Sequence, residues 1–385
     1  MAGARRWDVF CHVVDNYGDA GVAWRLARIL VAEHALDVTL WIDALAPLAR
    51  MAPEVAVECD MQTVDGVTVR KLTESLPLFE PADVVVDAFV GGLPDRYVEA
   101  MVARTPTPRW FQLEYLALEP GLDTHHGLPS PHPRLPLART FWFPGFSSRT
   151  GGLLRERGLL AARDAFATDA NAQNALWVSL GVAPPRGGEL RVSMFCYPDA
   201  PIEALLAAWS RGGTPVTCVV PDGVAVQALD RFAGGKPPKP HGPSLIVDHL
   251  ALAAIPFVSQ DVYDRLLWAC DVNFVRGEDS FVRAQWAAKP FVWHAYAQAE
   301  RAHAAKIAAF ADRYAAGLAP QSAAAVRALF DAWNALPGAT AIDAAWTAYD
   351  VQLMTLRTHG VRWSGELAAL PELAAGLVRV ARNTL

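Results

Sequence analysis

The chain contains 385 residues, of which 52% are hydrophobic and 19% are charged, and its formal net charge is −6 with a pI near 5.9. This length exceeds what one ordinary core supports, so two globular domains are expected, and the hydrophobic content excludes a disordered chain. The acidic balance provides no basic field for nucleic acid, so a nucleotide would bind only as a small ligand in a cleft.

The sequence shows no sign of a membrane segment, a metal site or a disulfide framework. The N-terminus has no apolar signal segment, and no run of about 18 apolar residues could span a bilayer. The five cysteines are widely spaced and the ten histidines form no ligand pattern, which is typical of free thiols in a reducing compartment. We therefore expect a cytoplasmic protein without membrane attachment, resident metal or other cofactor, and a monomer is the default expectation.

The first half of the chain alternates strand-like and helical patterns. Apolar runs that are typical of buried strands occupy residues 8–14, 37–42, 84–88 and 109–113. The apolar spacing within residues 22–33 predicts an amphipathic helix. Such alternation predicts a parallel sheet covered by helices, with ligands beyond the carboxyl ends of its strands. Residues 15–21 would lie at these carboxyl ends.

A segment rich in proline and glycine, residues 183–188, is the best candidate for a domain boundary. It divides the chain into an N-terminal domain of residues 1–183 and a second domain of residues 184–362. The second domain repeats the alternation, with strand-like runs at residues 190–197, 215–220, 244–247 and 272–275. Helical patterns over residues 363–385 end the chain.

The first candidate site is the stretch Asp-Asn-Tyr-Gly-Asp-Ala-Gly at residues 15–21. Taken singly, Asp15 could close a turn and Asp19 could cap a helix. Two acids that flank a glycine loop at the carboxyl end of a strand can also present a catalytic base. The loop is not GxGxxG, which disfavours an NAD-dependent oxidoreductase.

The second candidate site lies where the apolar run 272–275 ends at Arg276 and a helical pattern begins. The unpaired backbone N–H groups of a helix start, together with the positive end of its dipole, can hold an anion. Arg276 adds a cation whose planar fork suits phosphate. The bland alternative is that Glu278, Asp279 and Ser280 are ordinary first-turn and cap residues of this helix.

Aromatic and amide side chains accompany this helix start. Phe257 could stack on a nucleotide base and Gln260 could form hydrogen bonds with it. Phe195 and Tyr197 lie at the end of the first strand of the second domain. Each could instead be a core residue. Together they favour a nucleoside-diphosphate pocket and, with the acid loop, a two-domain glycosyltransferase. A transferase or epimerase acting on a small molecule and a non-catalytic nucleotide-gated binding protein remain open alternatives.

The two candidate sites resemble motifs of a known family, the protein-arginine rhamnosyltransferases that modify bacterial elongation factor P (the EarP family). The most specific match is Arg-Gly-Glu-Asp-Ser-Phe-Val-Arg-Ala-Gln at residues 276–285. The other matching stretches are residues 14–19, 24–28, 113–116, 151–156, 256–260 and 289–294. The sequence departs from the family pattern at Tyr17, where some relatives have phenylalanine, and at Ser259, where a proline is expected.

This resemblance implies an α/β architecture of the GT-B type, in which two Rossmann-like domains face a central cleft and the C-terminal helix, about residues 363–385, packs back on the first domain. It implies dTDP-β-L-rhamnose as donor and one arginine of elongation factor P as acceptor, with inversion at the sugar carbon. The modified factor would then rescue stalled ribosomes. No metal is implied, and no Asp-x-Asp pair stands at the donor motif.

The resemblance also assigns roles to individual residues. Asp19 is expected to be the general base, Asp15 a supporting acid and Glu278 a third essential acid. The residues expected to hold the donor are Phe195, Tyr197, Phe257, Gln260, Arg276, Asp279 and Ser280, with Asn16, Tyr17 and Gly18 of the acid loop. The chemistry is consistent with these acids, because a guanidinium is a poor nucleophile that carboxylates can orient and deprotonate.

Overall fold

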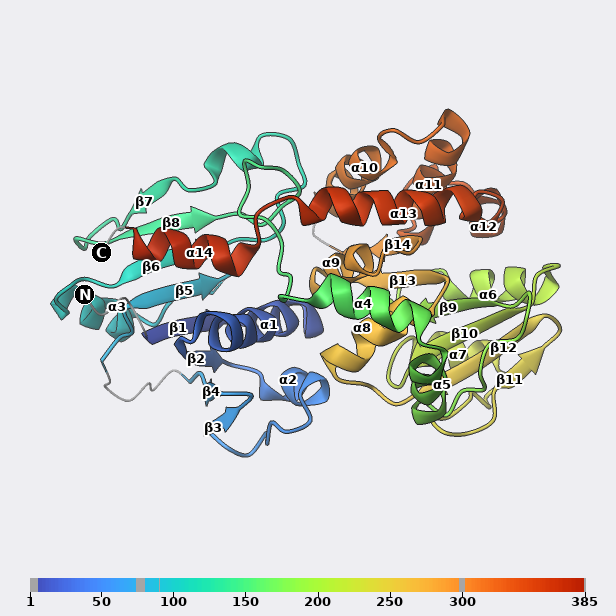
Figure 1. Ribbon diagram of the computed structural model, residues 1–385, viewed down its shortest axis with the longest axis horizontal. Coiled ribbons are helices and arrows are strands. Elements are labelled where there is room, and N and C mark those ends of the chain that lie inside the picture. The colour runs from blue at the N-terminus through green and yellow to red at the C-terminus, as the bar shows by residue number, and fades with distance from the viewer. Residues whose placement is uncertain (1–5, 74–79, 90, 298–301, 384–385) are drawn as a thin grey trace. The chain divides into compact units, whose positions relative to one another are not determined.

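The computed structural model describes residues 6–73, 80–89, 91–297 and 302–383 (Figure 1). The chain divides into two compact units. Unit 1 comprises Met1–Arg157 and Leu367–Leu385, and unit 2 comprises Gly158–Glu366. The boundary predicted at 183/184 differs from this division, because residues 158–183 form two helices that pack within unit 2. No helix among the described residues is both long and apolar enough to cross a bilayer.

Unit 1 contains an eight-stranded sheet, among its described residues, with the order β3-β4-β2-β1-β5-β6-β8-β7. Its strands are β1 (Arg6–Cys11), β2 (Asp37–Ile42), β3 (Met61–Val64), β4 (Val67–Lys71), β5 (Val84–Ala88), β6 (Arg109–Leu113), β7 (Pro129–Pro131) and β8 (Ala138–Trp142). All neighbouring pairs are parallel except β3–β4 and β7–β8. The strand order reverses between β1 and β5, which is where ligands bind in sheets of this kind.

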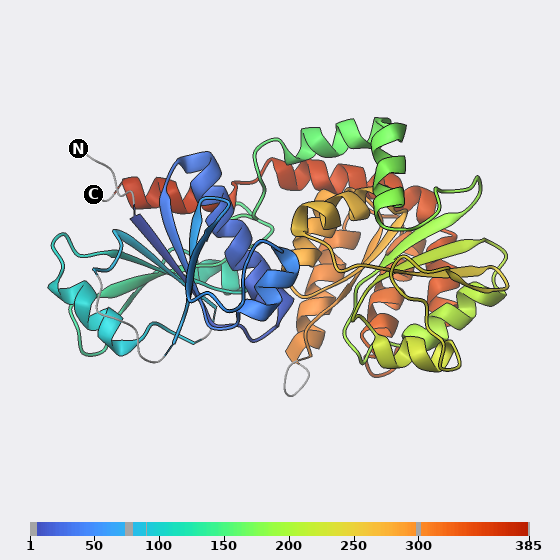
Figure 2. The same cartoon turned by 90° about the horizontal axis from the view of Figure 1, so that it is seen from below.

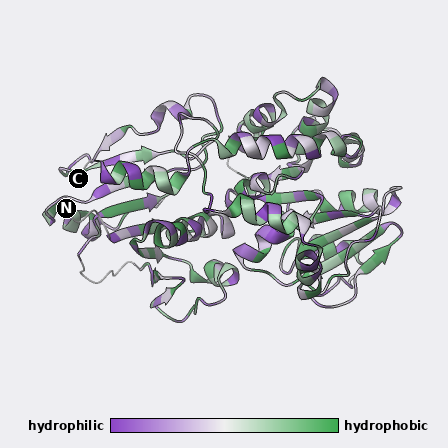
Figure 3. Cartoon of the chain, viewed as in Figure 1, coloured by the Kyte–Doolittle hydropathy of each residue, from purple (hydrophilic) through white to green (hydrophobic). Residues whose placement is uncertain are grey.

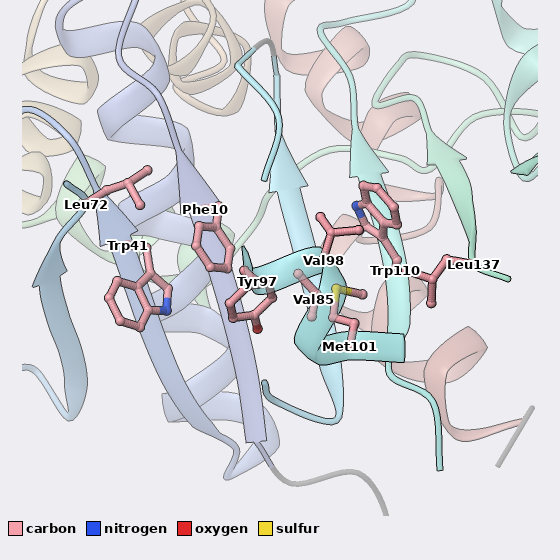
Figure 4. Close-up of a cluster of buried hydrophobic side chains, with 9 residues drawn as sticks. All are labelled: Phe10, Trp41, Leu72, Val85, Tyr97, Val98, Met101, Trp110 and Leu137. Atoms are coloured by element: carbon pink, nitrogen blue, oxygen red, sulfur yellow. The ribbon is translucent and has the colours of Figure 1, made fainter. Parts of the chain in front are cut away.

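Helices cover both faces of the unit 1 sheet. They are α1 (Tyr17–His34), α2 (Leu45–Met51), α3 (Asp95–Ala103), the 3₁₀ helix η1 (Leu122–His125) and α14 (Leu373–Arg382). On one face, α3 packs Tyr97 and Met101 against a cluster that includes Phe10 and Trp110 (Figure 4). Figure 2 shows α3 and the C-terminal helix α14 on opposite faces of this sheet. Residues 367–385 therefore belong to unit 1, where α14 contacts α1.

Unit 2 contains a six-stranded sheet, within the described residues, with the order β11-β12-β10-β9-β13-β14. Its strands are β9 (Leu190–Met194), β10 (Val216–Pro221), β11 (Leu245–Val247), β12 (Leu250–Ile255), β13 (Val272–Arg276) and β14 (Phe291–His294). All pairs are parallel except β11–β12. The order reverses between β9 and β13, so this unit also has a switch point at the carboxyl ends of two central strands.

The helices of unit 2 pack in two groups. They are α4 (Leu159–Thr168), α5 (Ala170–Ser179), α6 (Ile202–Arg211), α7 (Val226–Phe232), α8 (Gln260–Ala269), α9 (Asp279–Trp286), α10 (Ala302–Ala315), α11 (Pro320–Trp333), α12 (Ile342–Asp350) and α13 (Leu353–Ala368). Helices α4 and α5 pack on α8, where Phe166 and Trp268 meet edge to face with ring centroids 5.8 Å apart. Helix α6 packs on α12 through Trp209 and Trp346.

The strands form where the sequence is continuously apolar. Strand β5 and strand β10 are buried at every residue, as expected for parallel strands that helices cover on both faces. Figure 3 shows hydrophobic residues concentrated in such central strands and hydrophilic residues on the outer faces of the helices. Helices α4 and α5 are separated at Asp169, whose side chain accepts a hydrogen bond from the Ala172 N–H and caps α5.

Candidate active site

The acid loop of unit 1 follows β1 and leads directly into α1. Asn16 is the N-cap residue of α1 and has a positive φ of 39°, so the chain turns sharply between strand and helix. The Gly18 N–H donates to the Asp15 carbonyl over 2.6 Å and closes this turn. Asp19 lies in the first turn of α1, where the positive end of the helix dipole favours a carboxylate.

Backbone groups of its own loop hold the Asp19 carboxylate in place. Its Oδ2 accepts hydrogen bonds from the N–H groups of Val14 and Asp15, both over 2.8 Å. The side chain is only 2% exposed, and burial raises the pKa of Asp19 although these hydrogen bonds oppose the shift. The result is an oriented carboxylate that is more basic than an ordinary aspartate, as a general base requires.

Glycine at position 18 keeps the second acid in place. A Cβ atom added at Gly18 would lie 2.4 Å from Oδ2 of Asp15, closer than non-bonded atoms approach. Asp15 is 8% exposed, whereas Asn16 is exposed and Tyr17 is half-buried. The loop therefore packs its two acids inward, and it needs glycine because a larger residue would displace the carboxylate of Asp15.

Two side chains that support the acid loop were missed by the sequence reasoning. The Tyr115 hydroxyl donates to Asp19 and lowers its pKa, against the effect of burial. Arg50 of α2 donates to the Tyr17 hydroxyl over 3.1 Å. The resemblance included Tyr115 in a matching stretch, but no local pattern connects it to a loop almost 100 residues upstream. Only the adjacency of β1, β5 and β6 in the sheet brings them together.

In unit 2, Arg276 lies against two aromatic rings at the end of β13. Its guanidinium carbon is 4.7 Å from the ring centroid of Phe195 and 4.4 Å from that of Tyr197. Phe195 also meets Phe257 edge to face, with ring centroids 6.2 Å apart. Both contacts of Arg276 are within cation–π range, which holds the guanidinium at the carboxyl end of the sheet.

Two helix starts come together beside Arg276. Gln260, the first residue of α8, donates from Nε2 to Oδ2 of Asp279, the first residue of α9, over 3.1 Å. The Ser280 hydroxyl accepts from the Arg276 N–H over 3.1 Å and donates to the Arg276 carbonyl. Gly277, between them, adopts a positive φ of 61°. This turn joins the end of β13 to the N-terminus of α9, which is a favourable place for an anion.

Glu278 and His294 complete the surroundings of this turn. Glu278 is the half-buried N-cap residue of α9. His294 ends β14, pairs with Arg276 in the parallel register, and accepts the Tyr197 N–H on Nδ1 over 3.3 Å. Burial lowers the pKa of His294 to about 4 although Asp199 lies 3.6 Å from its Nε2. His294 is therefore neutral at physiological pH, and it is a contact that the sequence did not reveal.

The structure thus brings the predicted residues together in two clusters. The acid cluster, in unit 1, contains Asp15, Asn16, Tyr17, Gly18 and Asp19. The donor cluster, in unit 2, contains Phe195, Tyr197, Phe257, Gln260, Arg276, Glu278, Asp279 and Ser280. Each cluster lies at the carboxyl ends of the central strands of its own sheet. Among the residues that the structure describes, no group of three or more His, Cys, Asp or Glu side chains is placed to hold a metal ion.

Comparison with known proteins identifies the family. Residues 7–382 match the family described as elongation factor P (EF-P) rhamnosyltransferase EarP. The chain belongs to the EarP family. The curated relatives include a protein-arginine rhamnosyltransferase of Pseudomonas putida, which is 45% identical over 384 residues and is matched over 98% of this chain and 99% of the relative. The corresponding protein of Pseudomonas aeruginosa is 42% identical over 376 residues, covering 97% and 98% of the two chains.

Solved structures agree with this membership of the EarP family. A structure described as the structural basis for EarP-mediated arginine glycosylation of translation elongation factor EF-P matches with a TM-score of 0.68 and 35% identity, over 99% of both chains. MurG of Acinetobacter baumannii matches with a TM-score of 0.50 and 10% identity over 99% of both chains, which shows the fold alone. The fold is therefore that of GT-B glycosyltransferases, which confirms the predicted α/β class, and the chain is a member of a glycosyltransferase family.

Proposed function

We propose that this protein transfers L-rhamnose from dTDP-β-L-rhamnose to one arginine side chain of elongation factor P, with inversion at the sugar carbon. The observation that carries this proposal is the combination, in one EarP-family chain, of a buried and oriented carboxylate, Asp19, with a guanidinium, Arg276, held at a helix start. The first suits a proton acceptor and the second suits a diphosphate leaving group.

The proposed reaction makes one bond and breaks one bond. A nitrogen of the acceptor guanidinium attacks C1 of the sugar while the bond between C1 and the diphosphate oxygen breaks. The proton lost by that nitrogen passes to Asp19, and Asp15 supports the orientation of the guanidinium. Glu278 is proposed to order the sugar or the incoming guanidinium.

The leaving dTDP gains negative charge as the bond to the sugar breaks. We propose that Arg276 and the N-terminus of α9 stabilise this charge, so that the reaction needs no metal ion. Phe195, Tyr197 and Phe257 would supply aromatic surface for the nucleotide, and Gln260, Asp279 and Ser280 hydrogen-bonding groups. The acceptor is a translation factor, so we place the reaction in the cytoplasm, without nucleic acid or membrane as a partner.

Intact mass spectrometry of elongation factor P, incubated with this protein and dTDP-rhamnose in the presence of EDTA, tests the proposal. We expect a mass increase of one deoxyhexosyl residue, mapped to a single arginine, and a far slower increase with Asp19→Asn. Free arginine offered as a competing acceptor should remain unmodified. Modification of free arginine instead would identify a small-molecule acceptor, and turnover that requires an added metal would refute the metal-independent mechanism.

A further inference from the structure

Unit 1 contains a cavity of about 270 Å³ on the α3 face of its sheet, which the proposed reaction does not use. The polar and aromatic residues that line it include Asp87, Asp95, Trp110, His132 and Arg139. Asp87 lies on β5, next to β1 at the point where the strand order reverses. The volume equals that of roughly nine water molecules in the liquid, which suits a ligand the size of a side chain.

Asp87 is a buried carboxylate that accepts no hydrogen bond from the described residues. Its side chain is 1% exposed, and neither Oδ1 nor Oδ2 has a hydrogen-bond partner among the described residues. Burial raises the pKa of Asp87 to about 7, because Arg139 and His12 offset only part of the desolvation and Glu114 adds to the shift. Leaving such a group unpaired costs free energy unless a proton or a cation joins it.

Arg139, whose charge lowers the pKa of Asp87, makes its own contacts with other side chains. Arg139 donates from a terminal guanidinium nitrogen to Oε1 of Gln112 over 3.1 Å. Gln112 is fixed in turn, because its Nε2 donates to the carbonyls of Asp87 and Phe89 over 3.2 Å and 2.7 Å. The Arg139 guanidinium carbon also lies 5.9 Å from the Trp110 ring centroid. This wall of the cavity therefore accommodates a planar cation without pairing it to Asp87.

A second unpaired polar group lines the same cavity. The indole N–H of Trp110 has no acceptor among the described residues, although the side chain is only 7% exposed. Figure 4 shows Trp110 beside Val98 and Leu137, at one end of the hydrophobic cluster. Because Trp110 lines the cavity, the NMR signal of its indole N–H would be sensitive to a bound ligand.

The charges around the cavity favour a cationic ligand over a neutral or anionic one. Asp87 and Asp95 line the cavity, and Glu114, which follows β6, raises the pKa of Asp87, whereas Arg139 is the one guanidinium among the described lining residues. Two free oxygens on one carboxylate match the two parallel N–H groups of a guanidinium fork. Aromatic walls suit the flat faces of the same group.

We propose that this cavity binds a guanidinium group, with Asp87 as its anionic anchor. The described residues that line the cavity include none of the Asp19 loop, and binding there does not need the sugar donor. The guanidinium could come from a free small molecule or from an arginine side chain of the acceptor protein, and the experiment below distinguishes these sources. Binding is measured without donor or turnover. A failure to transfer rhamnose would therefore not contradict this binding site, and a failure to bind a guanidinium would not contradict the proposed transfer reaction.

The test is a titration of the full chain, labelled with ¹⁵N, with ethylguanidinium chloride at constant ionic strength. The Trp110 indole signal, assigned by its loss in Trp110→Phe, should shift in a saturable manner. Ethylurea, a neutral molecule of nearly the same shape, should leave it in place. Asp87→Asn keeps the shape of the side chain and should weaken ethylguanidinium binding at least tenfold, whereas Asp343→Asn, an exposed acid of unit 2, should not.

The wild-type chain supplies a second readout that does not depend on a variant folding. Ethylguanidinium requires an ionised Asp87, so its affinity should increase about tenfold between pH 6 and pH 8. The other charged or ionisable groups around Asp87 are Arg139, Asp95, Glu114, His12 and His132. The increase must therefore disappear in Asp87→Asn. An increase that persists, equal binding of ethylurea, or no saturable shift would each overturn the proposal.

The acceptor protein then separates the two sources. If an arginine of the acceptor occupies the cavity, Asp87→Asn should raise KM for the acceptor and leave kcat unchanged. If the natural ligand is a free small molecule, both constants should stay at wild-type values while ethylguanidinium binding is lost. Either result supports the site, and only the identity of its occupant differs.

Discussion

The acid cluster and the donor cluster occupy equivalent positions in two similar sheets and have opposite chemistry. Each lies at the carboxyl ends of the strands where the order reverses, β1 and β5 in unit 1 and β9 and β13 in unit 2. In the first, backbone N–H groups are aimed at the buried carboxylate of Asp19. In the second, a guanidinium stands over aromatic rings beside a helix start.

This difference shows how one type of unit can serve two chemical tasks. A helix that follows a parallel strand always presents unpaired N–H groups at the sheet edge. In the acid cluster, the carboxylate of Asp19 lies in the first turn of α1, where the positive end of the helix stabilises its negative charge. In the donor cluster Asp279 pairs with Gln260 instead, and Arg276 adds positive charge. The predictions below test this division of labour.

The largest expected effect is on the acid cluster. Asp19→Asn keeps the size of the side chain but removes the base, so kcat should fall by about 10²- to 10⁴-fold. Affinity for dTDP-rhamnose, measured by calorimetry, should stay near the wild-type value because the donor cluster is intact. Asp37→Asn, which changes an exposed carboxylate at the start of β2, is the matched control and should be neutral. Loss of donor affinity in Asp19→Asn would contradict the assignment.

Gly18→Ala should have the next largest effect. The added Cβ atom would lie 2.4 Å from Oδ2 of Asp15, so the Asp15 carboxylate would have to move. A misplaced catalytic group costs up to roughly 100-fold in rate. We expect a fall in kcat of that order with the thermal midpoint nearly unchanged, measured by steady-state kinetics and calorimetry. Gly187→Ala places a methyl group where nothing lies within 4 Å, and it should have wild-type activity. Full activity of Gly18→Ala would show that the position of Asp15 is unimportant.

Arg276→Ala tests the donor cluster. Removing a charged hydrogen-bond donor to the diphosphate should cost about 1.5–3 kcal/mol, or roughly 10- to 100-fold in Kd for dTDP. Arg276→Lys keeps the charge but loses the planar fork, so it should recover only part of the affinity. Isothermal titration with dTDP gives both values. If both variants bind dTDP like the wild type, Arg276 does not contact the diphosphate.

The sequence predicts much of this arrangement because both clusters depend on local patterns. An apolar run followed by polar turn residues and a helical period places Asp19 and Arg276 at strand ends without any knowledge of the rest of the chain. The fold class follows from the same alternation. The resemblance then indicated the donor residues, and the structure groups them through contacts such as the hydrogen bond from Gln260 to Asp279.

Three features could not be predicted, and each depends on long-range contacts. The proline- and glycine-rich segment 183–188 suggests a boundary, but the chain divides after Arg157, because α4 and α5 bury Phe166 and Trp177 within unit 2. His294 reaches Tyr197 only because β14 lies beside β13. The buried carboxylate of Asp87 resembles any polar residue at the end of a strand. That no described residue donates a hydrogen bond to it follows from the arrangement of the surrounding side chains.

The smallest expected effect is a change in the pKa of Asp19, the proposed general base. The Tyr115 hydroxyl stabilises the ionised form of Asp19, so Tyr115→Phe should raise the pKa of Asp19 further above its ordinary value. The ring would be kept, and with it the stacking on Phe89 at a centroid distance of 4.7 Å. The acidic limb of the kcat profile should therefore move to higher pH, with a loss of only a few-fold in rate at its plateau, because one hydrogen bond is worth about 1 kcal/mol. A series of rate measurements from acid to neutral pH gives this shift. The control is Tyr349→Phe, which also removes a buried tyrosine hydroxyl, one that donates to the Phe291 carbonyl in unit 2. An acidic limb that moves to lower pH, or moves equally in both variants, would mean that Tyr115 does not act on the base.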